Sequence, residues 1–217
     1  MGRLTWWMFR ARLAMEDPKS RAWDARHGVE TAAETALGDA GVAGDAVARG
    51  NGVYRVTWGG LIGKALGALD IADPGLWTFV DYGSGKGKAM LMAADYPFAR
   101  IVGVEFAPQL HAVAVRNCAA YRSPDQACRA LEPVLGDVLD YEPPAGPLVV
   151  FMCNPFDEAT LSAVFDRWRV RVAGGQTDLR VLYLNMREVA ESRGVLDAQT
   201  WLKPVARARQ FVVLAPV

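Results

Sequence analysis

The chain has 217 residues and carries 24 lysines and arginines against 24 aspartates and glutamates, so its formal net charge is zero. This length suffices for one α/β domain with an appended segment, and the balanced charge excludes a global field that would draw the chain to nucleic acid. No apolar run reaches the ~20 residues that cross a bilayer, so no membrane span is expected. Cys118, Cys128 and Cys153 lack the spacing of zinc ligands, which favours reduced thiols in a cytoplasmic protein.

Two stretches near the N-terminus are unusual. Residues 1–16 are expected to form a short helix whose Trp6-Trp7-Met8-Phe9 cluster packs on the main domain, or docks on a membrane or a partner. Residues 23–31 read W-D-A-R-H-G-V-E-T, which is either a capped turn around a buried tryptophan or a loop over a ligand. His27 in this stretch is a candidate general base, because an imidazole can exchange protons near neutral pH; the alternative is that it caps the loop.

From residue 54 onward the pattern becomes regular. A short extended segment at 54–57 and a helical spacing at 61–69 precede a run in which strands and helices alternate. Strands are expected at 79–82, 100–105, 133–135, 148–152 and 179–184, helices at 86–96, 108–121 and 159–172, and an antiparallel pair at 201–202 and 210–214. This alternation predicts a doubly wound α/β fold with a mostly parallel sheet and a ligand at the carboxyl ends of the strands.

A glycine-rich loop follows the first of these strands and opens a helix, the layout of a nucleotide-type ligand site. A Walker phosphate loop is excluded because Gly85-Lys86 is followed by Gly87 rather than by Ser or Thr. A dinucleotide fingerprint counted from Gly83 would place Lys88 where a small residue is needed. The pattern that fits is D-x-G-x-G-x-G, in which Asp81 lies two residues before three alternating glycines.

That pattern resembles motif I of the class I S-adenosylmethionine (SAM) methyltransferases. The resemblance implies a seven-stranded Rossmann-like sheet with an antiparallel C-terminal strand, and it implies SAM as the cofactor. In that family the strand-end acid, here Asp81, binds the methionine end of the cofactor, and the acid after the second strand, here Glu105, binds the ribose hydroxyls. The acid after the third strand, here Asp137, accepts a hydrogen bond from the adenine amino group. The implied cofactor-binding residues are Tyr54, Thr57, Asp81, Gly83, Ser84, Gly85, Gly87, Glu105, Phe106, Asp137, Val138 and Asn154.

A second motif follows the fourth strand, where Asn154-Pro155-Phe156 resembles motif IV of amino-directed methyltransferases with one proline missing. An amine must aim its lone pair at the methyl group, and the Asn154 oxygen can accept the amine hydrogens while Phe156 supports a flat or cationic group. Tyr54 and Thr57 resemble a pair found in seven-strand protein lysine methyltransferases. The W-D-x-R-H-G-V-x-T, D-x-G-S-G-K-G and N-P-F motifs together resemble a bacterial methyltransferase-like group.

The resemblance implies a SAM-dependent methyltransferase that transfers a methyl group in line to an amine or amide nitrogen of a small molecule or a protein side chain. The alternatives are an O-methyltransferase of a small molecule or peptide, and a non-catalytic SAM-binding scaffold. Residues 1–70 are expected to form a helical lid and substrate segment, and residues 71–217 the SAM-binding domain. The candidate catalytic residues are Asn154, Pro155, Phe156 and His27, and no metal is expected.

Overall fold

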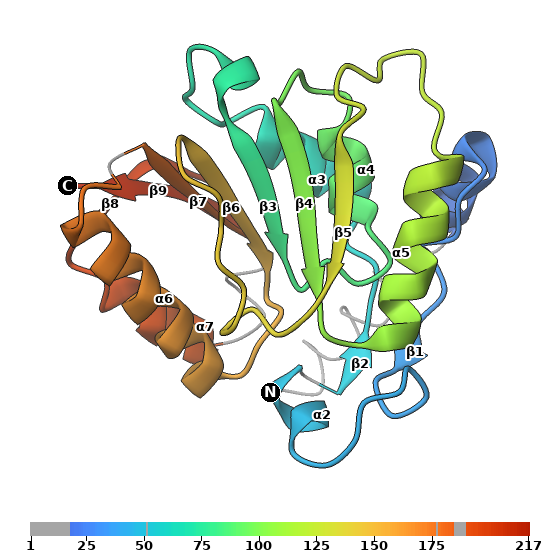
Figure 1. Cartoon of the computed structure of the whole chain (residues 1–217), viewed down its shortest axis with the longest axis horizontal. Coiled ribbons are helices and arrows are strands. Elements are labelled where there is room, and N and C mark those ends of the chain that lie inside the picture. The colour runs from blue at the N-terminus through green and yellow to red at the C-terminus, as the bar shows by residue number, and fades with distance from the viewer. Residues whose placement is uncertain (1–17, 51, 177, 185–189) are drawn as a thin grey trace.

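The protein is represented by a computed structural model that describes residues 18–50, 52–176, 178–184 and 190–217. Within these residues the centre of the molecule is a seven-stranded sheet with the order β5-β4-β3-β6-β7-β9-β8 (Figure 1). Its strands are β3 (Thr78–Tyr82), β4 (Arg100–Glu105), β5 (Leu131–Leu135), β6 (Leu148–Cys153), β7 (Leu179–Leu184), β8 (Leu202–Arg207) and β9 (Phe211–Pro216).

The first five of these strands are parallel, and β9 inserts antiparallel between β7 and β8. The chain runs from β3 outward to β4 and β5, and then returns to the other side of β3 to add β6 and β7. This reversal beside β3 is a topological switch point, where open α/β sheets bind their ligands. The doubly wound, mostly parallel sheet with antiparallel pairing at its C-terminal end is therefore confirmed.

Helices cover both faces of the sheet because its strands are apolar on both sides. Phe79 and Ile101 enter one core cluster with α3 (Gly59–Leu66) and α4 (Lys88–Ala93), whereas Val80 enters a second cluster with α6 (Glu158–Ala173) and α7 (Ala190–Asp197). Helix α5 (Pro108–Ala120) lies on the side of α3 and α4, as Figure 1 shows. Such strands, buried on both faces, read as continuous hydrophobic runs rather than as alternating patterns.

The predicted boundaries differ from the observed ones in instructive places. Helix α4 begins at Lys88 rather than at residue 86, because Gly87 has a φ of 87° and cannot belong to a right-handed helix. Strand β8 continues to Arg207, beyond the predicted residue 202, with Pro204 beside a register shift. Proline is tolerated there because β8 is the edge strand. Helix α7 was not predicted.

The described part of the N-terminal segment crosses the carboxyl edge of the sheet. Residues 18–27 are helical, and the short strands β1 (Thr35–Ala36) and β2 (Val53–Tyr54) pair antiparallel, with the one-turn helix α2 (Ala46–Arg49) between them. Helix α3, which the sequence-based division assigns to the lid, buries four side chains in the same cluster as Phe79. The helix expected at residues 1–16 lies outside the described residues. None of the described helices is long and apolar enough to cross a membrane.

Candidate functional site

Four polar side chains follow strands at the same edge of the sheet. Asp81 lies near the end of β3, Glu105 ends β4, Asp137 follows β5 and Asn154 follows β6. Because these strands are parallel and adjacent, their carboxyl ends meet on both sides of the switch point. The structure thus brings together the residues on which the sequence-based site was built.

The glycine-rich loop between β3 and α4 adopts a conformation that only glycine allows easily. Gly83 and Gly85 have φ values of 76° and 54°, in the left-handed region. A Cβ atom on Gly83 would lie 2.5 Å from Cβ of Pro155, and one on Gly85 would lie 2.5 Å from Cδ2 of Tyr54. Pro155 and Tyr54 therefore cover the loop closely. The Ser84 side chain instead lies against Gly103 of β4, where its hydroxyl has no partner among the described residues.

Two buried carboxylates lie beneath this loop. Glu105 accepts hydrogen bonds from the backbone N–H of Gly85 at 2.7 Å and of Ala107 at 2.8 Å. Burial raises the pKa of Glu105, and these backbone hydrogen bonds offset part of that rise. Burial and the charge of Glu105 raise the pKa of Asp81 well above its usual range. Neither carboxylate forms an ion pair with another described residue, so a cationic group bound beside them would be stabilised.

The side of the site expected to hold the nucleobase is closed in this structure. Asp137 accepts from Nη1 of Arg49 at 2.9 Å and from the N–H of Leu139 at 2.9 Å. A Cβ atom on Gly50 would lie 2.8 Å from Cζ of Phe106. The cavity that these residues enclose with Val138 has a volume of about 20 Å³, enough for about one water molecule and far less than a purine. Residues 49 and 50 must move before Asp137 can bind a base.

The Asn154 loop is strained and anchored. Asn154 has a φ of 48°, and no other non-glycine residue in the described part of the chain has a positive φ. Its Oδ1 accepts a hydrogen bond from the hydroxyl of Tyr183 at 3.2 Å, and Thr57 donates to Sγ of the preceding Cys153 at 2.9 Å. Residues held in sparsely populated backbone conformations cluster at active sites, where the surrounding structure over-determines them.

Phe156 is largely buried. Its side chain is only 7% exposed, belongs to the core cluster beneath α6 and lines the small cavity beside Val138. These contacts pack the ring beneath the nucleobase side of the site, and its expected support of a flat acceptor stays a prediction. The turn at Pro155 directs the Phe156 ring back toward the sheet, where burial of a large apolar ring is favourable.

His27 packs near the C-terminal end of α5. Its Nδ1 lies 2.9 Å from the carbonyl oxygen of Arg122, and its ring packs on Trp23 and Tyr121. These contacts are those of a packed side chain, and the role of His27 as a general base stays a prediction.

Several polar residues of the site were not singled out from the sequence. Lys86, Lys88 and Asn117 bind the 23–32 segment, Arg49 binds Asp137, and Tyr183 binds Asn154. The two lysines were considered only as ligands of a phosphate group, and the sequence excludes a phosphate loop. One feature of the sequence could have indicated their partners. The stretch at 23–31 is too polar to be core, and it contains two acids, Asp24 and Glu30, that could pair with the two lysines. Within the described residues, no cluster of potential metal ligands occurs.

Comparisons with known proteins support the fold. No protein-family model and no curated protein matches the chain. Among solved structures, a predicted N6-adenine-specific DNA methylase from Listeria monocytogenes matches with a TM-score of 0.53 at 12% identity over 74% of this chain and 51% of that one, so this chain spans about half its length. An M1A22 tRNA methyltransferase from B. subtilis matches with a TM-score of 0.51 at 10% identity, over 72% and 65% of the two chains. An RNA methyltransferase from Salinibacter ruber, solved with S-adenosylhomocysteine, matches with a TM-score of 0.50 at 17% identity, over 75% of this chain and 93% of that one.

Proposed function

We propose that this chain is a SAM-dependent methyltransferase of class I that acts on nitrogen. The observation that carries the proposal is the pair of buried carboxylates, Asp81 and Glu105, beneath a glycine loop at the switch point of a Rossmann-like methyltransferase fold. SAM is cationic at its sulfonium and ammonium groups and carries a ribose diol, which are the groups that such carboxylates bind. The fold is shared with DNA and RNA methyltransferases.

The residues present fit this cofactor on its methionine and ribose sides. Asp81 would hold the ammonium group and Glu105 the ribose hydroxyls, beside a glycine loop that Pro155 and Tyr54 cover. On the nucleobase side, Asp137 and Phe106 fit only after Arg49 and Gly50 have moved. When bound, SAM supplies an electrophilic methyl group on sulfur.

Asn154 supports transfer to nitrogen rather than to oxygen. In the proposed mechanism its Oδ1, which accepts from the hydroxyl of Tyr183 at 3.2 Å, would accept an N–H of the acceptor. An N–H held in this way directs the nitrogen lone pair, and such alignment is a large part of catalysis in a transfer between two bound groups. The acceptor class is an amine or amide nitrogen of a small molecule or protein side chain. A nucleobase nitrogen is the alternative that the fold relatives raise.

The described part of residues 1–70 is proposed to act as the lid of the site, and the protein is proposed to work in the cytoplasm. Support for the lid comes from Tyr54 over Gly85 and from Arg49 on Asp137, both in the N-terminal segment. No disulfide joins the three cysteines, as the reducing cytoplasm favours.

The direct test is calorimetric titration with SAM, S-adenosylhomocysteine and NAD. The first two are expected to bind, and NAD is not. Incubation with methyl-labelled SAM and fractionated cell extract then seeks the acceptor. Label found only on oxygen would favour an O-methyltransferase, and tight SAM binding without turnover in any fraction would favour a scaffold.

Cofactor binding is expected to release protons. Burial and the charge of Glu105 raise the pKa of Asp81 and so favour its protonated form in the free protein, whereas a bound ammonium group stabilises the ionised form. Affinity for S-adenosylhomocysteine should therefore rise with pH above the ordinary titration range of an aspartate, as long as the ligand's own α-amino group stays protonated. Calorimetry in two buffers of different ionisation enthalpy measures the released protons. An affinity that does not change with pH would contradict this electrostatic role.

Asp81→Asn is expected to weaken cofactor binding and to stabilise the free protein. Loss of a charged hydrogen bond costs roughly 1.5 kcal/mol or more, so affinity should fall about tenfold or more. Because the folded pKa of Asp81 is raised, its ionisation destabilises the fold as pH increases, and asparagine removes that cost. The gain in Tm, on the order of 2–4 °C for each kcal/mol, should shrink as pH falls toward about 4. Asp39→Asn, at an exposed position, is the matched control.

A further inference from the structure

Both lysines of the glycine loop are buried against residues 23–32, which we call the strap. Nζ of Lys86 lies 2.5 Å from Oε1 of Glu30. Nζ of Lys88 lies 3.5 Å from Oδ1 of Asp24 and 3.2 Å from the centre of the Trp23 ring. Each lysine is only 4% exposed. Removing a charge from water is costly unless it is paired and hydrogen-bonded, so these lysines depend on the strap, and the strap depends on them.

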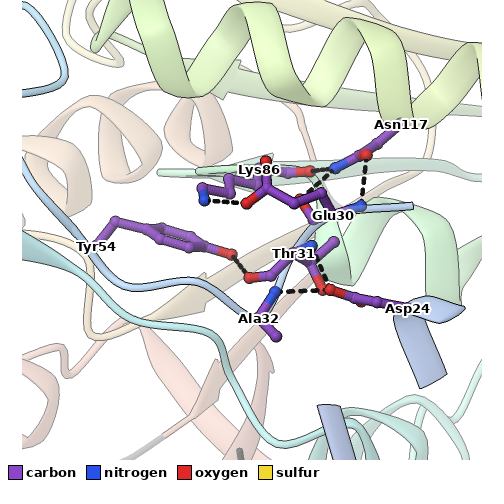
Figure 2. Close-up of polar contacts among 7 residues, drawn as sticks. All are labelled: Asp24, Glu30, Thr31, Ala32, Tyr54, Lys86 and Asn117. Carbon is purple, nitrogen blue, oxygen red and sulfur yellow. Dashed lines mark hydrogen bonds and ion pairs between the residues drawn. The ribbon is translucent and has the colours of Figure 1, made fainter. Parts of the chain in front are cut away.

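The strap consists of the end of the 18–27 helix and the turn that follows it, and it has its own internal bonds. Asp24 accepts from the N–H groups of Thr31 at 2.5 Å and Ala32 at 2.8 Å, and from the Thr31 hydroxyl at 2.6 Å. Asn117 of α5 then joins the turn to the glycine loop. It accepts from the N–H of Glu30 and donates to the carbonyls of Glu30 and Lys86, each at 2.9 Å, as Figure 2 shows.

This turn also fixes the residue that covers the glycine loop. The hydroxyl of Tyr54 donates to the carbonyl oxygen of Thr31 at 2.8 Å (Figure 2). The Tyr54 ring lies against Gly85, and Nζ of Lys86 lies 5.5 Å from its centre. Burial raises the pKa of the Tyr54 hydroxyl, so this group stays protonated and remains a donor. The strap therefore sets the position of the Tyr54 ring over the loop.

We propose that Glu30 and Lys86 are positioning residues that hold the strap, and through it Tyr54, in the arrangement that binds the cofactor. They act through Tyr54 rather than by touching the ligand. The inference rests on the proposed function, because cofactor affinity is its measured quantity. It gives the polar stretch at 23–31 a role that neither a capped turn nor a catalytic His27 supplies.

The test uses Glu30→Gln and Lys86→Met, each of which removes one charge and keeps the length of the side chain. We expect each to raise the Kd for S-adenosylhomocysteine about fivefold to tenfold in calorimetry of the full chain. The Kd of the double variant should rise by less than the product of the two single increases. Each single variant leaves one charge of the pair unpaired, whereas the double variant has neither charge. Lys203→Met, at an exposed position of β8, should leave the Kd unchanged.

The path through Tyr54 is tested separately. In a Tyr54→Phe background, which lacks the bond to Thr31, Glu30→Gln should change the Kd by less than twofold. Glu30→Gln and Lys86→Met could instead lower the Tm while their Kd stays within twofold of wild type. That result would show that the strap only packs against the domain, and it would overturn the inference. Glu30 is half-exposed, so Glu30→Gln tests the proposal even if Lys86→Met does not fold. Wild-type protein that binds no S-adenosylhomocysteine would instead overturn the proposed function, and the inference with it.

Discussion

A valine at position 85 is expected to abolish SAM binding while leaving the sheet folded. Gly85 has a φ of 54°, which a β-branched residue rarely adopts, and its Cβ would lie 2.5 Å from Cδ2 of Tyr54. Valine must therefore displace either the loop or the Tyr54 ring. Displacement of the loop would also disturb the bond from the N–H of Gly85 to Glu105. Calorimetry measures binding, and far-ultraviolet circular dichroism measures whether the fold persists.

The chain contains a matched control for backbone strain. Gly146 has a φ of 97° in the connection before β6, and a Cβ atom there would meet nothing within 4 Å. Gly146→Val should thus impose left-handed strain of on the order of 1–3 kcal/mol without any clash, and it should leave SAM affinity unchanged. If Gly85→Val bound SAM as tightly as wild type, the loop would not pack against the ligand.

The sheet could be predicted from the sequence because β3, β4 and β6 are largely apolar runs that contain a polar residue at the end or lead directly into one. Strands 100–105 and 179–184 were placed correctly to the residue. The meeting of Asp81, Glu105, Asp137 and Asn154 then follows from the rule that parallel strands share their carboxyl edge. The positions of these four residues depend only on the order of strands and helices along the chain, which can be read from a single sequence.

The strap contacts could not be predicted in the same way. Lys86 meets Glu30 across 56 positions, and Asn117 meets it across 87, so no periodicity links them. The positions of Phe156 and His27 could not be predicted for a related reason, since residue type suggested chemistry, whereas the packing of Phe156 in the core and of His27 near the end of α5 depends on tertiary contacts. The closure of the nucleobase side by Arg49 also depends on a tertiary ion pair.

Loss of the Asn154 side chain is expected to lower turnover by about 100-fold, the order found when one preorganised polar group is removed, and to leave SAM affinity within about threefold. The contact matters most as the nitrogen lone pair aligns with the methyl group, so it lowers the barrier more than it strengthens ground-state binding. The assay follows the labelled product that wild-type protein forms from methyl-labelled SAM. Asn154→Ala makes this change, but alanine adds strain at a φ of 48°.

Asn154→Gly separates the side chain from the strain, because glycine adopts this backbone conformation freely. If the amide oxygen orients the acceptor, the glycine and alanine variants should lose turnover equally. Tyr183→Phe, which keeps Asn154 but removes the hydroxyl that donates to its Oδ1 at 3.2 Å, should cost only roughly the several-fold expected from one neutral hydrogen bond. Turnover that survives in Asn154→Gly would show that the residue serves the backbone of the loop, and it would leave the chemistry to another group at the end of β6.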